Sequence, residues 1–264
     1  MTASASTTPG TIRVARSEFK YQIFSDDLPA IRQWLSRYCV PDENSRSGDW
    51  YAIRSLYLDT NEFRLYRDAE EKLPFRFKLR ARAYGDATGS IKLEVKRRIQ
   101  DLIVKTSATV RAPQWAEAAG EGLRGLYDIA TPSMAEFLQL TDTLGATPRM
   151  LVYYERQAFS SFLDGYVRVT FDRHMACQTM RSWDLRGDAR EWVCVDAPTA
   201  FAERDSAYVM EIKFVDSPPA WLRDLVLRFG LQRRGFSKYG RAVQRMVLGF
   251  EPALDRTPGA WSAA

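Results

Sequence analysis

The chain has 264 residues, of which 38 are Lys or Arg and 33 are Asp or Glu, so its formal net charge is +5. A hydrophobic fraction of 45%, with 12% aromatic residues, excludes an intrinsically disordered chain, and the modest net charge excludes a one-sided polycation. The length suffices for the core of one large domain or of two small ones.

The chemistry available to the chain is narrowed by its cysteines and its histidine. The three cysteines, Cys39, Cys177 and Cys194, have no CxxC spacing, which speaks against a disulfide framework or a zinc cluster. His174 is the only histidine, so a catalytic triad or a multi-histidine metal site would depend on one imidazole. If the protein is an enzyme, we expect its working groups to be carboxylates, lysines and arginines.

The two ends of the chain carry no sign of a membrane segment. No stretch reaches the roughly 18 apolar residues that mark a membrane-spanning helix, and small polar residues rather than a signal peptide follow Met1. We therefore expect a cytoplasmic protein. Residues 1–12 and 251–264 lack apolar periodicity and predict flexible tails.

In chain order, the first predicted elements are a strand over residues 16–23 and a helix over residues 28–38. In this strand Glu18 and Lys20 alternate with apolar residues, so the period of two places both charged side chains on one face. The next strand, over residues 75–83, alternates more strongly. Its polar face carries only cations, namely Arg76, Lys78, Arg80 and Arg82.

Two more alternating strands follow, over residues 91–96 and 102–107. The charged side chains on their polar faces are Lys92, Glu94, Lys96 and Lys105. A helix is predicted next, starting at a capping box that Ser133 forms with Glu136.

The second half of the chain repeats the pattern in strands over residues 151–159, 167–171 and 208–214. Their polar faces contribute Tyr154, Arg156, Arg168, Glu211 and Lys213. A helix is predicted after Ser217 and Pro218, where a polar residue and a proline precede an apolar stripe.

The last predicted element is a helix over residues 238–250, with Ser237 as its N-cap. Lys238 then stands in the first turn, where free backbone N–H groups also favour an anion. Simple capping beside a solvated lysine is the alternative reading.

Seven strands thus share polar faces on which cations predominate. Each face could simply meet water, as in many one-sided antiparallel sheets. Solvated faces, however, usually mix uncharged and charged residues. A sheet closed into a barrel would instead place alternate residues in a lumen lined by cations. Because buried unpaired ions cost several kcal/mol, an anionic guest would be expected there, and guanidinium and ammonium groups match phosphate oxygens.

At these residues the sequence resembles the VTC-type polyphosphate polymerase domain, a member of the triphosphate tunnel metalloenzyme superfamily. The resemblance covers about residues 13–250, nearly everything outside the tails. It rests on short pieces in the family's order: RSEFKY (16–21), SLYLDT (55–60), KLRARAY (78–84), LEVK (93–96), Lys105, YERQAF (154–159), VRVTFD (167–172), MEIK (210–213) and FSKY (236–239).

The resemblance implies an α+β fold in which an antiparallel β-barrel of about eight strands forms a tunnel with helices packed outside. It implies that inward cations act on phosphates, namely Lys20, Arg80, Arg82, Lys96, Lys105, Arg156, Arg168 and Lys238. Further substrate-binding candidates are Lys78, Tyr154, Lys213 and Ser237, with Tyr154 either a hydrogen-bond donor or a barrel-lining aromatic residue. The implied cofactor is Mn²⁺ or Mg²⁺ on Glu211, with Glu18 and Glu94 either contacting metal or pairing with lysines.

The activity implied by the resemblance is transfer of the γ-phosphate of ATP to a growing polyphosphate chain. The partners would be ATP and polyphosphate, and a separate membrane partner is left open. The nucleophile, a terminal phosphate oxygen, is already ionised near neutral pH, so no histidine base is required. Hydrolytic and cyclase relatives begin with ExExK, whereas Arg16 occupies the first position here, which favours the polymerase branch.

Two alternatives remain beside the polymerase. One is hydrolysis of tripolyphosphate or of a nucleoside triphosphate, and the other is a polyanion-binding module without catalysis. A nucleic-acid partner is not expected, because aromatic residues and cations mostly lie on opposite strand faces rather than interleaved for base stacking.

Overall fold

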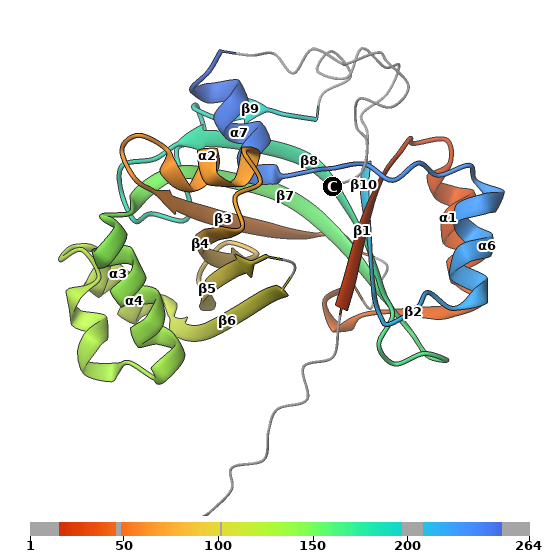
Figure 1. Ribbon diagram of the computed structural model, residues 1–264, viewed down its shortest axis with the longest axis horizontal. Coiled ribbons are helices and arrows are strands. Elements are labelled where there is room, and N and C mark those ends of the chain that lie inside the picture. The colour runs from red at the N-terminus through yellow and green to blue at the C-terminus, as the bar shows by residue number, and fades with distance from the viewer. Residues whose placement is uncertain (1–15, 46–48, 101, 197–207, 250–264) are drawn as a thin grey trace, which may run out of the picture.

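The computed structural model describes residues 16–45, 49–100, 102–196 and 208–249. A curled antiparallel sheet forms its centre (Figure 1). In the order of pairing, its eight main strands are β1 (Arg16–Ile23), β10 (Tyr208–Val215), β8 (Arg168–Thr179), β7 (Thr147–Ser161), β3 (Tyr51–Asp59), β4 (Phe75–Tyr84), β5 (Ser90–Ile99) and β6 (Leu102–Arg111). Two short strands lie off this path, β2 (Cys39–Pro41) beside β7 and β9 (Val193–Cys194) beside β8. The predicted fold class is confirmed, while the predicted tails, 1–12 and 251–264, lie outside the described residues.

Successive side chains of a strand point to opposite faces of the sheet, so the charged and the apolar residues of these strands lie on different faces. On β4, Leu79 and Ala81 are fully buried on one face, and Arg80 and Arg82 point to the other. Burial of such apolar faces contributes about 25 cal/mol per Å². The sheet therefore has an apolar outer face and a charged inner face.

Alternation alone did not predict β3, although it lies inside the sheet between β7 and β4. Leu56 and Leu58 are buried on its outer face, and Tyr57 and Asp59 are buried on its inner face. A strand buried on both faces has no polar side with which to show a period of two.

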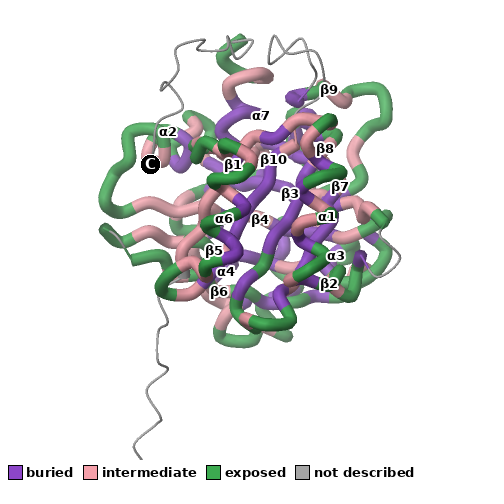
Figure 2. Tube along the Cα trace, turned by 90° about the vertical axis from the view of Figure 1, so that its right-hand side faces the viewer, coloured by how far each residue is buried: buried purple, intermediate pink, exposed green. Residues whose placement is uncertain are grey.

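Two pairs of helices cover the outer face at opposite ends of the sheet (Figure 1). α1 (Leu28–Leu35) and α6 (Ala220–Arg228) pack against β1, β10 and β8, and Figure 2 shows the buried strands behind α6. α3 (Ala112–Ala119) and α4 (Pro132–Leu144) pack against β4, β5 and β6 through residues such as Phe137. Among the described residues, no helix is long and apolar enough to span a membrane.

α2 (Arg64–Glu70) and α7 (Lys238–Met246) instead contact the inner face at one end. The ring of Tyr239 on α7 stacks on Tyr57 at 4.8 Å between centroids, and its hydroxyl donates to Asp59 Oδ2 at 2.6 Å. This end of the inner face is therefore closed by an aromatic and apolar cluster. Two short 3-10 helices, η1 (Glu43–Ser45) and η2 (Arg124–Ile129), complete the elements of the described residues.

The helix starts show which capping predictions were right. Ser237 is the N-cap of α7, because its Oγ accepts a hydrogen bond from Gly240 N at 3.0 Å. The predicted capping box of Ser133 was wrong: Thr131 caps α4, and Glu136 forms an ion pair with Arg97. The helix predicted after residues 217 and 218 is α6, whose N-cap is Pro219. The helices predicted to reach 38 and 250 end at Leu35 and Met246.

Candidate functional site

The predicted site residues come from seven strands and the start of α7, and their side chains share the inner face of the sheet. They are Glu18 and Lys20 (β1), Glu211 and Lys213 (β10), Arg168 (β8), Tyr154 and Arg156 (β7), Lys78, Arg80 and Arg82 (β4), Glu94 and Lys96 (β5), Lys105 (β6), and Ser237 and Lys238 (α7). Strand register places them side by side, because directly opposite residues point to the same face.

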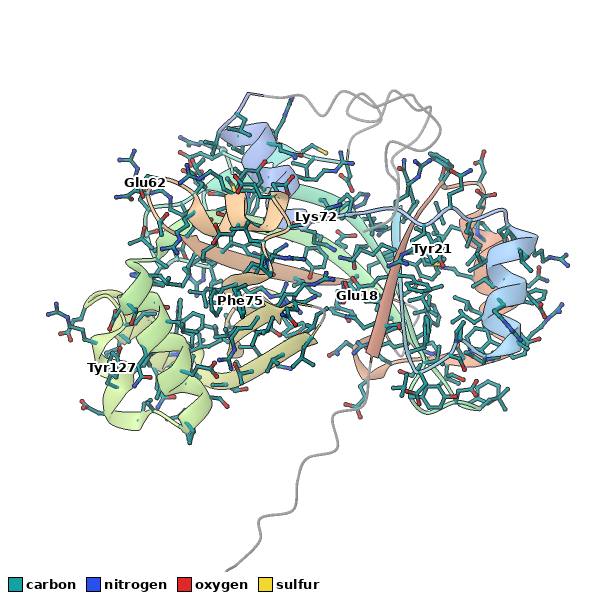
Figure 3. The ribbon with its side chains drawn as sticks, in the orientation of Figure 1. Glu18, Tyr21, Glu62, Lys72, Phe75 and Tyr127 are labelled. Atoms are coloured by element: carbon teal, nitrogen blue, oxygen red, sulfur yellow. The ribbon has the colours of Figure 1, made fainter. Side chains whose placement is uncertain are left out.

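The curl of the sheet brings its two ends together across this face. β1 and β5 are six pairing steps apart, which would separate them by about 29 Å in a flat sheet. Nevertheless, Lys96 Nζ lies 3.7 Å from Glu18 Oε2. In Figure 3, Glu18 lies on the side of β1 that faces β4 and β5, whereas Tyr21 lies toward α1 and α6. The inner face is therefore concave and lined from both ends of the sheet.

The first charged group joins β1 and β10. Lys20 Nζ lies 3.1 Å from Glu18 Oε1 and 3.9 Å from Glu211 Oε2, and Lys213 Nζ lies 2.5 Å from Glu211 Oε1. Burial alone would raise the pKa of Glu211, but Lys213 and Lys20 hold it well below its ordinary value. Two charged carboxylates thus share two lysines.

The second charged group surrounds Glu94, which is almost fully buried. Arg80 Nε lies 2.6 Å and Arg82 Nε 3.6 Å from Glu94 Oε2, and Lys105 forms an ion pair with Oε1. Burial would raise the pKa of Glu94, but Arg80 and Arg82 hold it well below the ordinary range. Arg80 also donates to the Tyr57 hydroxyl at 3.2 Å. Arg82 Nε is buried without a hydrogen-bond partner in the described structure, so this group retains donor capacity.

The third charged group surrounds Asp172, whose part in the site the sequence did not reveal. Its carboxylate accepts two hydrogen bonds from Arg156, at 2.6 and 2.8 Å, and one from Lys238 at 2.5 Å. Asp172 is fully buried. The sequence did contain a signal for Asp172. It lies two residues after Thr170 on β8, and residues two apart on a strand point to the same face, here the inner face.

Tyr154 lies between these cations and the apolar cluster. Its ring is buried, with Lys238 Nζ 4.5 Å and the Arg156 guanidinium carbon 5.4 Å from its centroid. Stacking of cations on an aromatic face is favourable, so the ring helps to hold both side chains.

Lys78 differs from the other inner cations. Its Nζ donates to Ser237 Oγ at 3.1 Å, and among the described residues no carboxylate forms an ion pair with it. Burial, reinforced by Lys20 and Lys96, lowers its pKa to about 8. Lys78 is therefore a partly buried cation that an incoming anion can neutralise.

The balance of charge on this face is positive. Arg168 lies apart at its exposed rim, where Nη2 is 2.6 Å from Asp42 Oδ2. In the three charged groups, together with Lys78 and Lys96, nine cations stand against four carboxylates: Lys20, Lys78, Arg80, Arg82, Lys96, Lys105, Arg156, Lys213 and Lys238 against Glu18, Glu94, Asp172 and Glu211.

Two of the predicted metal ligands lie together. Glu18 and Glu211 face each other across the same lysines, whereas Glu94 belongs to the second group. Within the part of the chain that the structure describes, no three Asp, Glu, His or Cys side chains gather as a metal site. Mg²⁺ in phosphate-transfer sites is commonly held by one or two carboxylates together with substrate phosphates. Glu18 and Glu211 fit that donor set.

Comparisons with known proteins give one family and a number of structural likenesses, among them the following two. A protein from Vibrio parahaemolyticus, named as a candidate adenylate cyclase, aligns over 86% of this chain and 96% of its own, with a TM-score of 0.45 and 13% identity. The PH1819 protein from Pyrococcus horikoshii aligns over 87% and 96%, with a TM-score of 0.42 and 10% identity. No curated protein matches. The sequence profile of the VTC domain matches residues 15–247, and the chain therefore belongs to the VTC domain family.

Proposed function

We propose that this protein is a metal-dependent polyphosphate polymerase, which transfers the γ-phosphate of ATP to the end of an inorganic polyphosphate chain on the inner face. The observation that carries this proposal is the excess of cations in these charged groups, nine against four carboxylates. Holding so many like charges close together costs free energy, and the buried guanidinium groups of Arg82 and Arg156 also lose hydration. A polyanion with many phosphate oxygens offsets that cost.

Each of the three charged groups contributes side chains that would bind phosphates. Arg80 and Arg82 present guanidinium groups beside Glu94, which keeps them in place through its own ion pairs. Lys78 and Lys238 stand at the N-terminus of α7, where free N–H groups also favour an anion. Lys20, Lys96, Lys105, Lys213 and Arg156 complete the lining of the face.

The transfer needs positioning more than proton removal. An ionised terminal oxygen of the polyphosphate chain attacks the γ-phosphorus, the bond from that phosphorus to the bridging oxygen breaks, and ADP leaves with the electron pair. The cations neutralise charge that spreads over the transferring group.

The same carboxylates give less support to hydrolysis. Lys213 and Lys20 lower the pKa of Glu211, and Arg156 and Lys238 lower the pKa of Asp172, in each case against the effect of burial. A carboxylate with a lowered pKa is a weak base for activating water. A phosphate nucleophile requires no such base.

The proposed cofactor is Mn²⁺ or Mg²⁺ held by Glu211 and Glu18. When bound, the ion would supply positive charge that offsets the charge of the transferring phosphate. Lys20 and Lys213, which contact both carboxylates, would orient them and hold phosphate beside them.

One incubation tests the proposal: purified protein with ATP and either Mn²⁺ or Mg²⁺, with readouts of chain length, ADP and free phosphate. Long chains with stoichiometric ADP support the polymerase. Free phosphate without chains would replace the proposal with a hydrolase, and tight polyphosphate binding without turnover would replace it with a binding module.

Substitutions test whether the activity depends on the residues of the inner face. Glu211→Gln should abolish metal-dependent turnover, and the pair Arg80→Ala and Arg82→Ala should weaken triphosphate binding by at least about tenfold, because each lost charge-assisted contact is worth about 1.5–3 kcal/mol. Arg223→Ala removes a cation from the exposed side of α6 and is the matched control. Unchanged rates in both inner-face variants would place the chemistry elsewhere.

A further inference from the structure

Five apolar side chains are exposed together at the ends of β4, β5 and β6, which we call the hairpin tip. Their exposed fractions are 37% for Leu73, 60% for Phe75, 39% for Ile99, 44% for Leu102 and 47% for Ile103. Register places three of them side by side on the outer face, because Phe75 pairs with Ile99 and Ile99 pairs with Leu102, whereas Ile103 lies opposite Arg98 on the other face. Most exposed apolar residues occur singly, so a contiguous group indicates a contact surface.

The hairpin tip extends beyond the helices that cover the outer face. α3 and α4 pack on buried residues further along the same strands, such as Leu79, Leu93 and Val95. The backbone of the tip is held in place, since Gln100 N donates to Pro74 O at 2.7 Å. Figure 3 labels Lys72, on the segment that follows α2, and Phe75, the first residue of β4.

The hairpin tip is also basic. Apart from Lys96 and Lys105 in the charged groups and Arg97 in its ion pair with Glu136, the described cations at the tip are Lys72, Arg76 and Arg98. Arg76 pairs directly with Arg98 across the strands, so like charges stand side by side. Burial, together with Arg98, lowers the pKa of Arg76. A patch with both cations and exposed apolar side chains is complementary to a surface with anionic groups on the outside and apolar groups beneath them.

We propose that the hairpin tip docks on an anionic lipid surface, with Phe75, Ile99 and Leu102 entering the headgroup region and Lys72 and Arg76 contacting acidic lipids. Apolar burial and attraction to anionic lipids together set the strength of interfacial binding. A second copy of this chain is the less favoured occupant, because a two-fold contact would oppose two basic patches. The proposal does not depend on the activity proposed above.

Vesicle co-sedimentation of the whole chain tests this docking, with vesicles of phosphatidylcholine alone or mixed with phosphatidylserine. We expect binding to the mixed vesicles, weakened by added salt because the electrostatic part is screened. Phe75→Ser combined with Leu102→Ser should reduce the partition coefficient at least about tenfold, since both lost side chains contribute apolar burial. Lys72→Gln combined with Arg76→Gln should reduce it mainly on phosphatidylserine.

The control is Phe162→Ser combined with Leu163→Ser, which removes two exposed apolar side chains from the β7–β8 connection. This variant should bind vesicles as the unchanged protein does, and thermal melts should show all variants folded. The proposal is overturned if the Phe75 and Leu102 variant binds mixed vesicles normally. The proposal is also overturned if the unchanged protein does not bind the vesicles and instead self-associates through the residues of the hairpin tip, as measured by gel filtration.

Discussion

Among single residues, Asp172 has the largest expected effect on stability. It is fully buried, and its replacement by Asn would leave Arg156 and Lys238 as buried cations without their carboxylate. Breaking a buried ion pair from one side costs about 3–5 kcal/mol. We expect Asp172→Asn to lower the free energy of unfolding in urea by about that amount, and tripolyphosphate to restore part of it.

The control for this prediction is Asp42→Asn, which breaks the exposed ion pair with Arg168. Exposed pairs are worth about 0–1 kcal/mol, so this variant should unfold nearly as the unchanged protein does. Equal losses at positions 172 and 42 would contradict the assignment of Asp172 as the anchor of two buried cations.

Lys78 should make phosphate binding depend on pH near neutrality. Burial lowers its pKa to about 8, so the folded protein loses this proton at a lower pH than the unfolded chain does. The charged form attracts phosphate, and tripolyphosphate affinity should therefore fall as pH rises through about 8. Calorimetric titrations at several pH values measure this decline. Lys78→Arg, which stays charged, should flatten it, whereas Lys92→Arg on β5 should not.

Among the elements, α7 connects the apolar end of the inner face to its charged groups. Tyr239 Oη donates to buried Asp59 at 2.6 Å, two positions after the Ser237 cap. Tyr239→Phe removes this hydrogen bond to a charged group, which should cost about 1.5–3 kcal/mol in the free energy of unfolding. It should also weaken tripolyphosphate binding, because Lys238 lies on the same turn.

Tyr127→Phe is the matched control for that change. The Tyr127 hydroxyl donates to Asp142 Oδ2 at 2.5 Å, but on an exposed part of the chain. Its loss should change the free energy of unfolding by less than about 1 kcal/mol. Urea titrations of both variants compare the two directly, and a larger loss in Tyr127→Phe would refute the buried role of Tyr239.

At the scale of the whole molecule, the cation excess couples folding to anion binding. A ligand at a hundred times its dissociation constant stabilises the folded state by about 2.7 kcal/mol, which corresponds to about 5–11 °C for a protein of this size. Tripolyphosphate should therefore raise the melting temperature in thermal melts at constant ionic strength. The combined Arg80→Ala and Arg82→Ala variant should show a smaller rise, and an unaffected melting temperature in the unchanged protein would contradict the predicted site.

The sequence by itself determined the features that depend on neighbours along the chain. The period of two in β1, β4, β5 and β10 assigned charged and apolar faces, and the Ser237 cap followed from local chemistry. The match to family motifs placed these faces in a tunnel. Two features were missed because their local signals were absent or ambiguous. The strand β3 has no alternation to show, because it is buried on both faces. The cap of α4 is Thr131 rather than the predicted Ser133.

Only the tertiary structure decided how the charges are grouped. The contact of Glu18 with Lys96 exists because the sheet curls, and that of Asp172 with Lys238 exists because α7 folds onto the inner face. Neither contact follows from a spacing along the chain, since the residues come from elements that are far apart in the sequence. The order of residues thus determined which side chains are charged and toward which face each strand directs them, whereas the curvature of the sheet and the docking of α7 determined which carboxylate each cation contacts.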